Sequence, residues 1–203
     1  ALGEALGVDG DVFVRWSFEE MTAWGKHAYR RKDNRFIPML TDGYSLEGLV
    51  LDRKGYYGPK GKVIEAIPAD ADFFWMYAYG YRLTGDEFLW RMARDIGRGI
   101  GLGDIGEPHA GGTAPAWNPS YANFDYRLLN GLMELYEATR TFAFLECAHR
   151  GAEAALAQSV NGWLGTWNGK LVVTNHPLPL TLLRLAALDR QEGSYPSRIV
   201  LFN

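Results

Sequence analysis

The feature that most limits the possible folds is a pair of helical patterns between residues 70 and 101, joined by a very short turn. Asp70 can cap the first helix, and Gly85 stands where a left-handed residue would end it. Asp86 follows at once as a cap for the second helix. Two helices joined by so short a turn must lie antiparallel, so the segment predicts an αα-hairpin.

A second helical pair is predicted over residues 121–158, and it is related to the first. Tyr81 aligns with Tyr136 at a separation of 55 residues. The same separation places Thr84 on Thr139, which keeps the turn between the helices in register. Matched positions at a fixed separation indicate a repeated structural unit. The sequence therefore predicts a mainly α-helical fold, an array of α/α-hairpins of the toroid type with short β segments.

The remaining segments are predicted to surround these hairpins. They comprise an amphipathic helix at 11–30, short strands at 36–40, 49–51 and within 163–173, a glycine-rich loop at 101–120, and a helix at 177–190. About six or seven hairpins close a toroid, and 203 residues supply about three. We therefore expect residues 1–203 to be part of a single toroid domain that leaves apolar faces of its end hairpins uncovered.

Composition excludes several classes of protein. Hydrophobic residues make up 47% of the chain and charged residues 22%, with a net charge of -3, which argues against disorder and against a nucleic-acid-binding surface. No run of eighteen apolar residues occurs, so no membrane-spanning helix is expected. Cys147 is the single cysteine and cannot form an internal disulfide, which leaves periplasmic, cytoplasmic and secreted locations open.

The strongest candidate for a binding site is the loop DRKGYYGPKGK, residues 52–62, which combines cations with aromatic rings. Cations bind the carboxylates of an acidic sugar, and rings stack on sugar faces. We expect Tyr57 and Lys60 to lie nearest the reacting sugar. The other substrate-binding candidates in this loop are Arg53, Tyr56 and Lys62. A solvated basic turn with no ligand is the alternative interpretation.

Two further groups of polar residues are weaker candidates. Tyr121 and Arg127 flank the predicted start of a helix and are expected to contribute to substrate binding. Asp104, Glu107 and His109 could bind a divalent metal, but they lack a defined ligand spacing, so a surface loop is the favoured interpretation. Motifs of serine hydrolases, P-loop proteins and zinc proteases are absent from the sequence.

Several segments together resemble the family 2 pectate lyases over most of residues 11–190. They are RKDNRFIPMLTDG, GYYGPKGKVIEA, ADADFFWMYAYGYRLTGDEFLWRMARDIGRGIGLGD and NHPLPLTLLRLAALD. The resemblance implies a barrel of about seven α/α-hairpins that cleaves polygalacturonate by β-elimination. It also implies a divalent metal, a transition metal or calcium, that neutralises the substrate carboxylate, and an arginine that abstracts the proton.

The sequence departs from the pattern of this family in the residues expected to bind the metal and to act as the base. The resemblance implies a metal held by two histidines and a glutamate, with the arginine next to one histidine. Here His149 and Arg150 have the opposite order, so neither role is transferred to them. This departure suggests that the metal and the base lie outside this stretch, which would then supply barrel wall and subsites for an acidic polysaccharide or oligogalacturonate.

Two other functions remain compatible with the residues. A toroid hydrolase of unsaturated uronyl oligosaccharides would share the hairpins and the basic, aromatic subsites, but it would use water and a carboxylate, and its activity should survive chelation. A non-catalytic helical-repeat module would bind carbohydrate or another partner without turnover.

Overall fold

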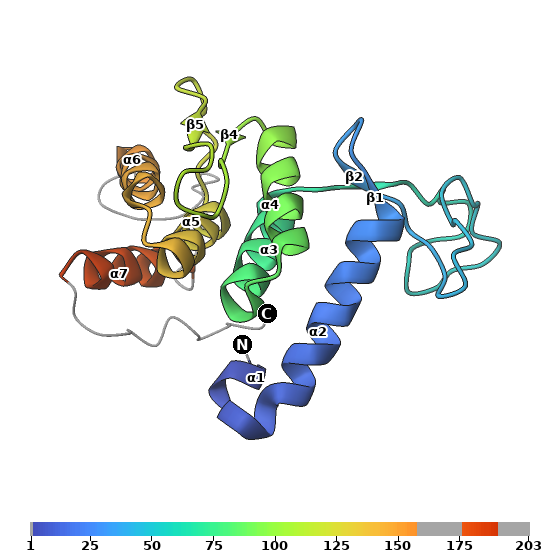
Figure 1. Cartoon of the computed structure of the whole chain (residues 1–203). Coiled ribbons are helices and arrows are strands. Elements are labelled where there is room, and N and C mark those ends of the chain that lie inside the picture. The colour runs from blue at the N-terminus through green and yellow to red at the C-terminus, as the bar shows by residue number, and fades with distance from the viewer. Residues whose placement is uncertain (1, 158–175, 191–203) are drawn as a thin grey trace.

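The computed structural model describes residues 2–157 and 176–190, and within them the fold is mainly helical (Figure 1). The helices are α1 (Leu2–Ala5), α2 (Asp11–Ala23), α3 (Ala71–Thr84), α4 (Glu87–Gly99), α5 (Tyr126–Thr139), α6 (Phe142–Ala157) and α7 (Leu178–Asp189). Short 3-10 and π segments, η1 (Gly7–Gly10) and η2 (Trp24–Ala28), flank α2. The strand predicted within 163–173 lies outside the described residues.

The hairpin of α3 and α4 is confirmed together with its caps. The Asp70 carboxylate accepts a hydrogen bond from the N–H of Asp72, and the Asp86 carboxylate accepts one from the N–H of Phe88. Gly85 has a φ of 68°, and its N–H donates to the carbonyl of Tyr81. The left-handed glycine reverses the chain, so the two helices pack side by side.

The 55-residue repeat is confirmed at the level of individual hydrogen bonds. Asp125 caps α5 as Asp70 caps α3, which is why α5 begins at Tyr126 and not at residue 121. Arg140 takes a left-handed φ of 55° at the position that Gly85 holds in the first hairpin. The hydroxyls of Thr84 and Thr139 donate to carbonyls four residues earlier, both at 2.8 Å.

Burial follows the same repeat. Each buried residue of α4 has a buried counterpart 55 positions later in α6. The pairs are Leu89 and Phe144, Trp90 and Leu145, Met92 and Cys147, Ala93 and Ala148, Ile96 and Gly151, and Gly97 and Ala152. The repeated unit therefore buries one helix face against one common core.

Three of the helices form a layer in which they run parallel. Asp72 near the start of α3 pairs with Arg127 near the start of α5, and Arg82 near the end of α3 pairs with Glu134 of α5. α7 lies on the other side of α5, with Arg184 bound to Glu134. The helices α4 and α6 pack against this layer. Because α3 and α5 are parallel, the long segments that lead into these two helices gather at one end of the layer. Closure of the array into a ring remains a prediction.

The helix predicted at 11–30 is confirmed as α2 and the π segment η2, which ends at Ala28. The chain then enters a small antiparallel sheet of β1 (Tyr29–Arg30), β2 (Arg35–Phe36) and β3 (Ile67–Pro68). Phe36 is fully buried, and its ring stacks on that of Phe73 in α3 at 4.3 Å between centroids. This contact fixes the sheet to the N-terminal half of α3.

Two further strands, β4 (Gly103–Asp104) and β5 (Ala116–Trp117), close the loop between α4 and α5. The predicted strands near 36–40 and 49–51 are confirmed as β2 and as single bridges, Met39 with Ser45 and Val50 with Val63. Within the described residues, none of the helices is long and apolar enough to cross a membrane.

Candidate functional site

Most of the segment between β2 and β3, residues 37–65, extends away from the helices beside the C-terminal end of α2 (Figure 1). We call it the arm. None of its residues is buried. Its two limbs are joined by backbone hydrogen bonds, among them Gly48 N–H to the Ile64 carbonyl and Leu51 N–H to the Lys62 carbonyl, both at 2.8–2.9 Å. The arm is therefore held by its backbone and not by an apolar core.

The tip of the arm carries the predicted binding residues and presents them to solvent. Tyr56 is 98% exposed and Tyr57 64% exposed, and their rings meet edge to face at 5.4 Å between centroids. The side chains of Arg53, Lys54 and Lys60 form no hydrogen bond or ion pair with any residue that the structure describes. Unpaired cations next to exposed rings are chemically suited to an acidic sugar.

Lys62 differs from the other cations of the tip because it braces the turn. Its Nζ donates a hydrogen bond of 2.8 Å to the backbone carbonyl of Tyr57. Gly58 has a φ of 141°, and a Cβ at this position would lie 2.5 Å from the Lys62 side chain. Glycine is thus required at residue 58, and Lys62 holds the turn that presents Tyr57.

Tyr121 and Arg127 lie at the same end of the helical layer, but they form a separate group. Arg127 pairs with Asp72 at 2.9 Å and with Asp125 at 3.2 Å. The Tyr121 hydroxyl donates to the carbonyl of Asn123. Burial, and less strongly Asp125, raises the pKa of Tyr121 to about 12, so its phenol stays protonated at neutral pH. Among the described contacts, none joins this group to the tip of the arm.

A comparison with known families decides what this array of hairpins is. The sequence model of the periplasmic pectate lyases matches residues 1–199. The chain belongs to this pectate lyase family. The match covers the arm, both hairpins and α7, so it confirms the resemblance carried by those segments.

The metal implied for pectate lyases of this type does not fit the residues that the structure describes. Within residues 2–157 and 176–190, no three histidine, cysteine or acidic side chains converge as a metal site would require. The candidate ligands Asp104 and Glu107 are both bound by Arg94 of α4. Hydrogen bonds from Arg94 hold the pKa of Asp104 well below its usual range. These carboxylates fasten the loop of β4 to α4.

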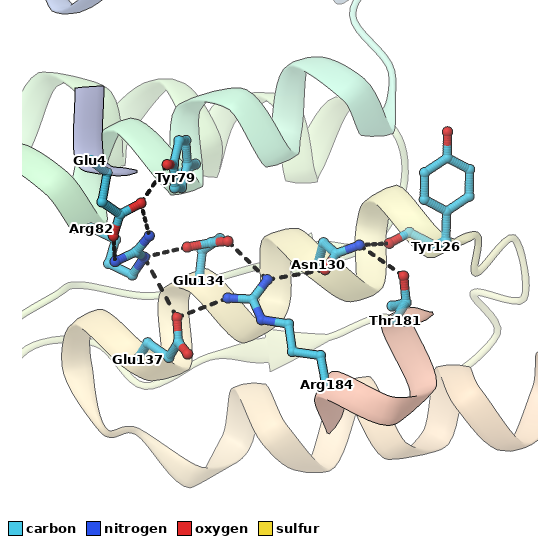
Figure 2. A network of polar contacts seen from close by, with 9 residues as sticks. All are labelled: Glu4, Tyr79, Arg82, Tyr126, Asn130, Glu134, Glu137, Thr181 and Arg184. Carbon is cyan, nitrogen blue, oxygen red and sulfur yellow. Dashed lines mark hydrogen bonds and ion pairs between the residues drawn. The ribbon is translucent and has the colours of Figure 1, made fainter. Parts of the chain in front are cut away.

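The lyase fold also contains a network of buried charges that sequence reasoning missed (Figure 2). Arg184 of α7 is 2% exposed and binds Glu134 at 2.9 Å and Glu137 at 2.8 Å. Glu134 also accepts from Arg82, which in turn binds Glu4 of α1 at 3.0 Å. The network joins α1, α3, α5 and α7, so these charges hold the layer together. The sequence did contain one sign of this network, the two glutamates at 134 and 137, which lie one turn apart on a helix with a buried face.

Proposed function

We propose that this protein takes part in the cleavage of polygalacturonate by β-elimination, and that the arm binds the uronate residues of the substrate. The family establishes a pectate lyase-like function in general terms. The single observation that supports the role of the arm is the set of unpaired cations beside exposed tyrosine rings at its tip. A polygalacturonate chain carries a carboxylate on each sugar, so spaced cations match it.

In β-elimination, a base removes the proton from C5 of a galacturonate. The electron pair forms the C4–C5 double bond, the C4–O bond breaks, and the departing oxygen takes up a proton. Negative charge spreads onto the C6 carboxylate as the proton leaves. A cation that contacts this carboxylate stabilises the transition state more than the ground state.

The residues of the arm receive distinct roles in this proposal. Lys60 contacts the carboxylate of the reacting sugar, and Tyr57 packs against its ring. Arg53 and Tyr56 bind neighbouring sugars, and Lys62 keeps Tyr57 in position through its hydrogen bond to the backbone. No described residue is assigned as the base, and no step is assigned to a metal, since the described residues lack its ligands.

Replacing Lys60 by Ala in the full-length protein tests this assignment. The expected result is a fall in kcat/KM on polygalacturonate by a factor of about ten or more, because a charge-assisted contact contributes roughly 1.5–3 kcal/mol. The appearance of unsaturated product, followed by ultraviolet absorbance, measures the rate. Lys32→Ala is the matched control, an exposed lysine on the β1–β2 turn outside the arm.

The same assay separates the competing functions. Cleavage that yields new reducing ends without ultraviolet absorbance, and that survives a chelator, would identify a hydrolase. Binding of polygalacturonate without any turnover would identify a non-catalytic module. Unchanged kinetics and unchanged thermal stability in Lys60→Ala would mean that the arm tip is only a solvated basic turn.

A further inference from the structure

The arm is joined to the rest of the chain mainly at its root. There the Ile37 N–H donates to the Ala28 carbonyl at 2.8 Å, and Met39 packs against the core. Beyond these residues the backbone hydrogen bonds of the arm run within the arm itself. Among the described residues, a single hydrogen-bonded pair of side chains links the arm to another element. It joins Glu47 of the arm to Arg30 of β1.

This pair has a bidentate geometry. Arg30 Nη1 donates to Glu47 Oε2 at 2.7 Å, and Nη2 donates to Oε1 at 3.0 Å. These hydrogen bonds hold the pKa of Glu47 below its usual value, so its carboxylate is ionised at neutral pH. Two parallel bonds fix the direction in which the carboxylate approaches as well as its distance, whereas a single bond fixes mainly the distance.

Arg30 is itself held in place by a second carboxylate. Its Nε and Nη2 donate to the Asp33 carboxylate at 2.9 Å and 2.8 Å. Asp33 lies in the turn between β1 and β2, outside the arm. The guanidinium thus uses one edge for Asp33 and the other for Glu47, so Asp33 keeps it oriented toward the arm.

The β1–β2 turn has a fixed position on the helices. Asn34 takes a left-handed φ of 53°, and its amide donates to the Ala69 carbonyl at 2.7 Å and accepts from the Tyr29 hydroxyl at 2.9 Å. Arg31 pairs with Asp95 of α4 at 2.8 Å. The position of α4 is therefore passed through this turn to Arg30, and from Arg30 to the arm.

We propose that Arg30 is a positioning residue for substrate binding, whose paired bonds to Glu47 set the direction in which the arm leaves the helices. The inference rests on the proposed function of the arm, since it matters only if the tip binds uronates. Arg30 contacts no sugar. It places the cations of the tip where the polygalacturonate chain passes, and a displaced binding group loses most of its contribution.

Titration calorimetry with an oligogalacturonate tests the pair by exchange of its charges in the full-length protein. Arg30→Glu and Glu47→Arg each place like charges opposite one another, and each should raise the Kd about tenfold. The double variant Arg30→Glu/Glu47→Arg restores an attractive pair and should return the Kd to within about threefold of the wild type. Circular dichroism checks that all three variants fold.

Glu47→Arg is the more informative single variant. It makes the arm more positive, so simple attraction of an anionic substrate would tighten binding, whereas the proposal predicts weaker binding. Glu65→Arg is the matched control, because Glu65 is an exposed glutamate of the arm with no described partner. It adds the same charge without breaking the anchor, so its Kd should stay at the wild-type value or fall.

A distance measurement tests the anchor without any substrate. Spin labels are attached to cysteines introduced at Lys54 on the tip and at Arg91 on the exposed side of α4, with Cys147 replaced by Ala. Pulsed electron paramagnetic resonance should give a narrow distribution of distances in the wild-type background. The distribution should be broad or displaced in Glu47→Arg and narrow again in the charge-exchanged double variant.

Three outcomes would overturn the proposal. Distances that are the same in all variants would show that the pair does not direct the arm. A displaced arm in Glu47→Arg with an unchanged Kd, while Lys60→Ala weakens binding, would leave the arm as a binding site and remove the positioning role of Arg30. An unchanged Kd in Lys60→Ala as well would overturn both the positioning role and the proposed function of the arm.

Discussion

The arm and the layer of parallel helices use charged residues in opposite ways. In the layer, Arg82 and Arg184 are enclosed by carboxylates and are 14% and 3% exposed at their side chains. On the arm, Arg53 and Lys60 lie in solvent without a partner among the described residues. Charge that is paired and buried holds one arrangement of helices, whereas charge left unpaired is available to a ligand.

Among the substitutions that test this contrast, we expect the largest loss of stability from one in the buried charge network. Arg184→Ala removes the closer of the two cations bound to Glu137, which keeps Arg82 at 3.6 Å, and one of the two cations bound to Glu134. We expect a loss of about 3 kcal/mol or more in the free energy of unfolding, since removal of one partner leaves buried charge uncompensated. Chemical denaturation measures it. Arg15→Ala is the control, because its pair with Glu19 is exposed and should contribute under about 0.5 kcal/mol. Equally small losses of unfolding free energy in both variants would show that the network has no structural role.

Two glycines, one in the helical layer and one on the arm, test the same contrast through their packing. A Cβ on Gly131 would lie 2.6 Å from the ring of Phe74, which is fully buried between α3 and α5. Gly131→Ala should therefore destabilise the chain by about 1–2 kcal/mol, despite the better helix preference of alanine. A Cβ on Gly55 of the arm would meet no atom within 4 Å, so Gly55→Ala should change the stability by less than about 0.5 kcal/mol. Thermal unfolding of the two variants side by side measures the difference.

Acid should weaken the contact between α4 and the loop of β4. Arg94 holds the pKa of Asp104 below its usual value, so Asp104 stabilises the fold above about pH 3.9 and loses this contribution as the pH falls through its folded-state pKa. Asp104→Asn should cost about 1 kcal/mol at pH 7, and its deficit relative to the wild type should shrink below about pH 4. A deficit in Asp104→Asn that stays constant with pH would contradict this assignment.

What could be predicted from the sequence was local. Asp70, Gly85 and Asp86 gave the caps and the turn of the first hairpin, because each of these residue types acts on the backbone within a few positions of itself. The repeat then extended the prediction to the second hairpin. The basic, aromatic tip was visible for the same reason, since all its residues lie within eleven consecutive positions.

What could not be predicted depends on pairs that are distant in the chain. Arg82 meets Glu134 and Arg184 meets Glu137 only when three helices are packed together. Asp104 resembled a metal ligand because nothing in its own loop shows that Arg94 binds it. The burial of Phe36 also depends on a distant pair, since its ring stacks on that of Phe73 in α3.

The charges of the arm are proposed to serve the substrate and not the fold. The direct test is the double substitution Arg53→Ala/Lys60→Ala in the full-length protein, with two quantities measured on the same sample. Titration calorimetry with an oligogalacturonate should show a Kd raised about tenfold or more, while the free energy of unfolding stays within about 0.5 kcal/mol of the wild type. An unchanged Kd, or a loss of stability as large as that of Arg184→Ala, would contradict it.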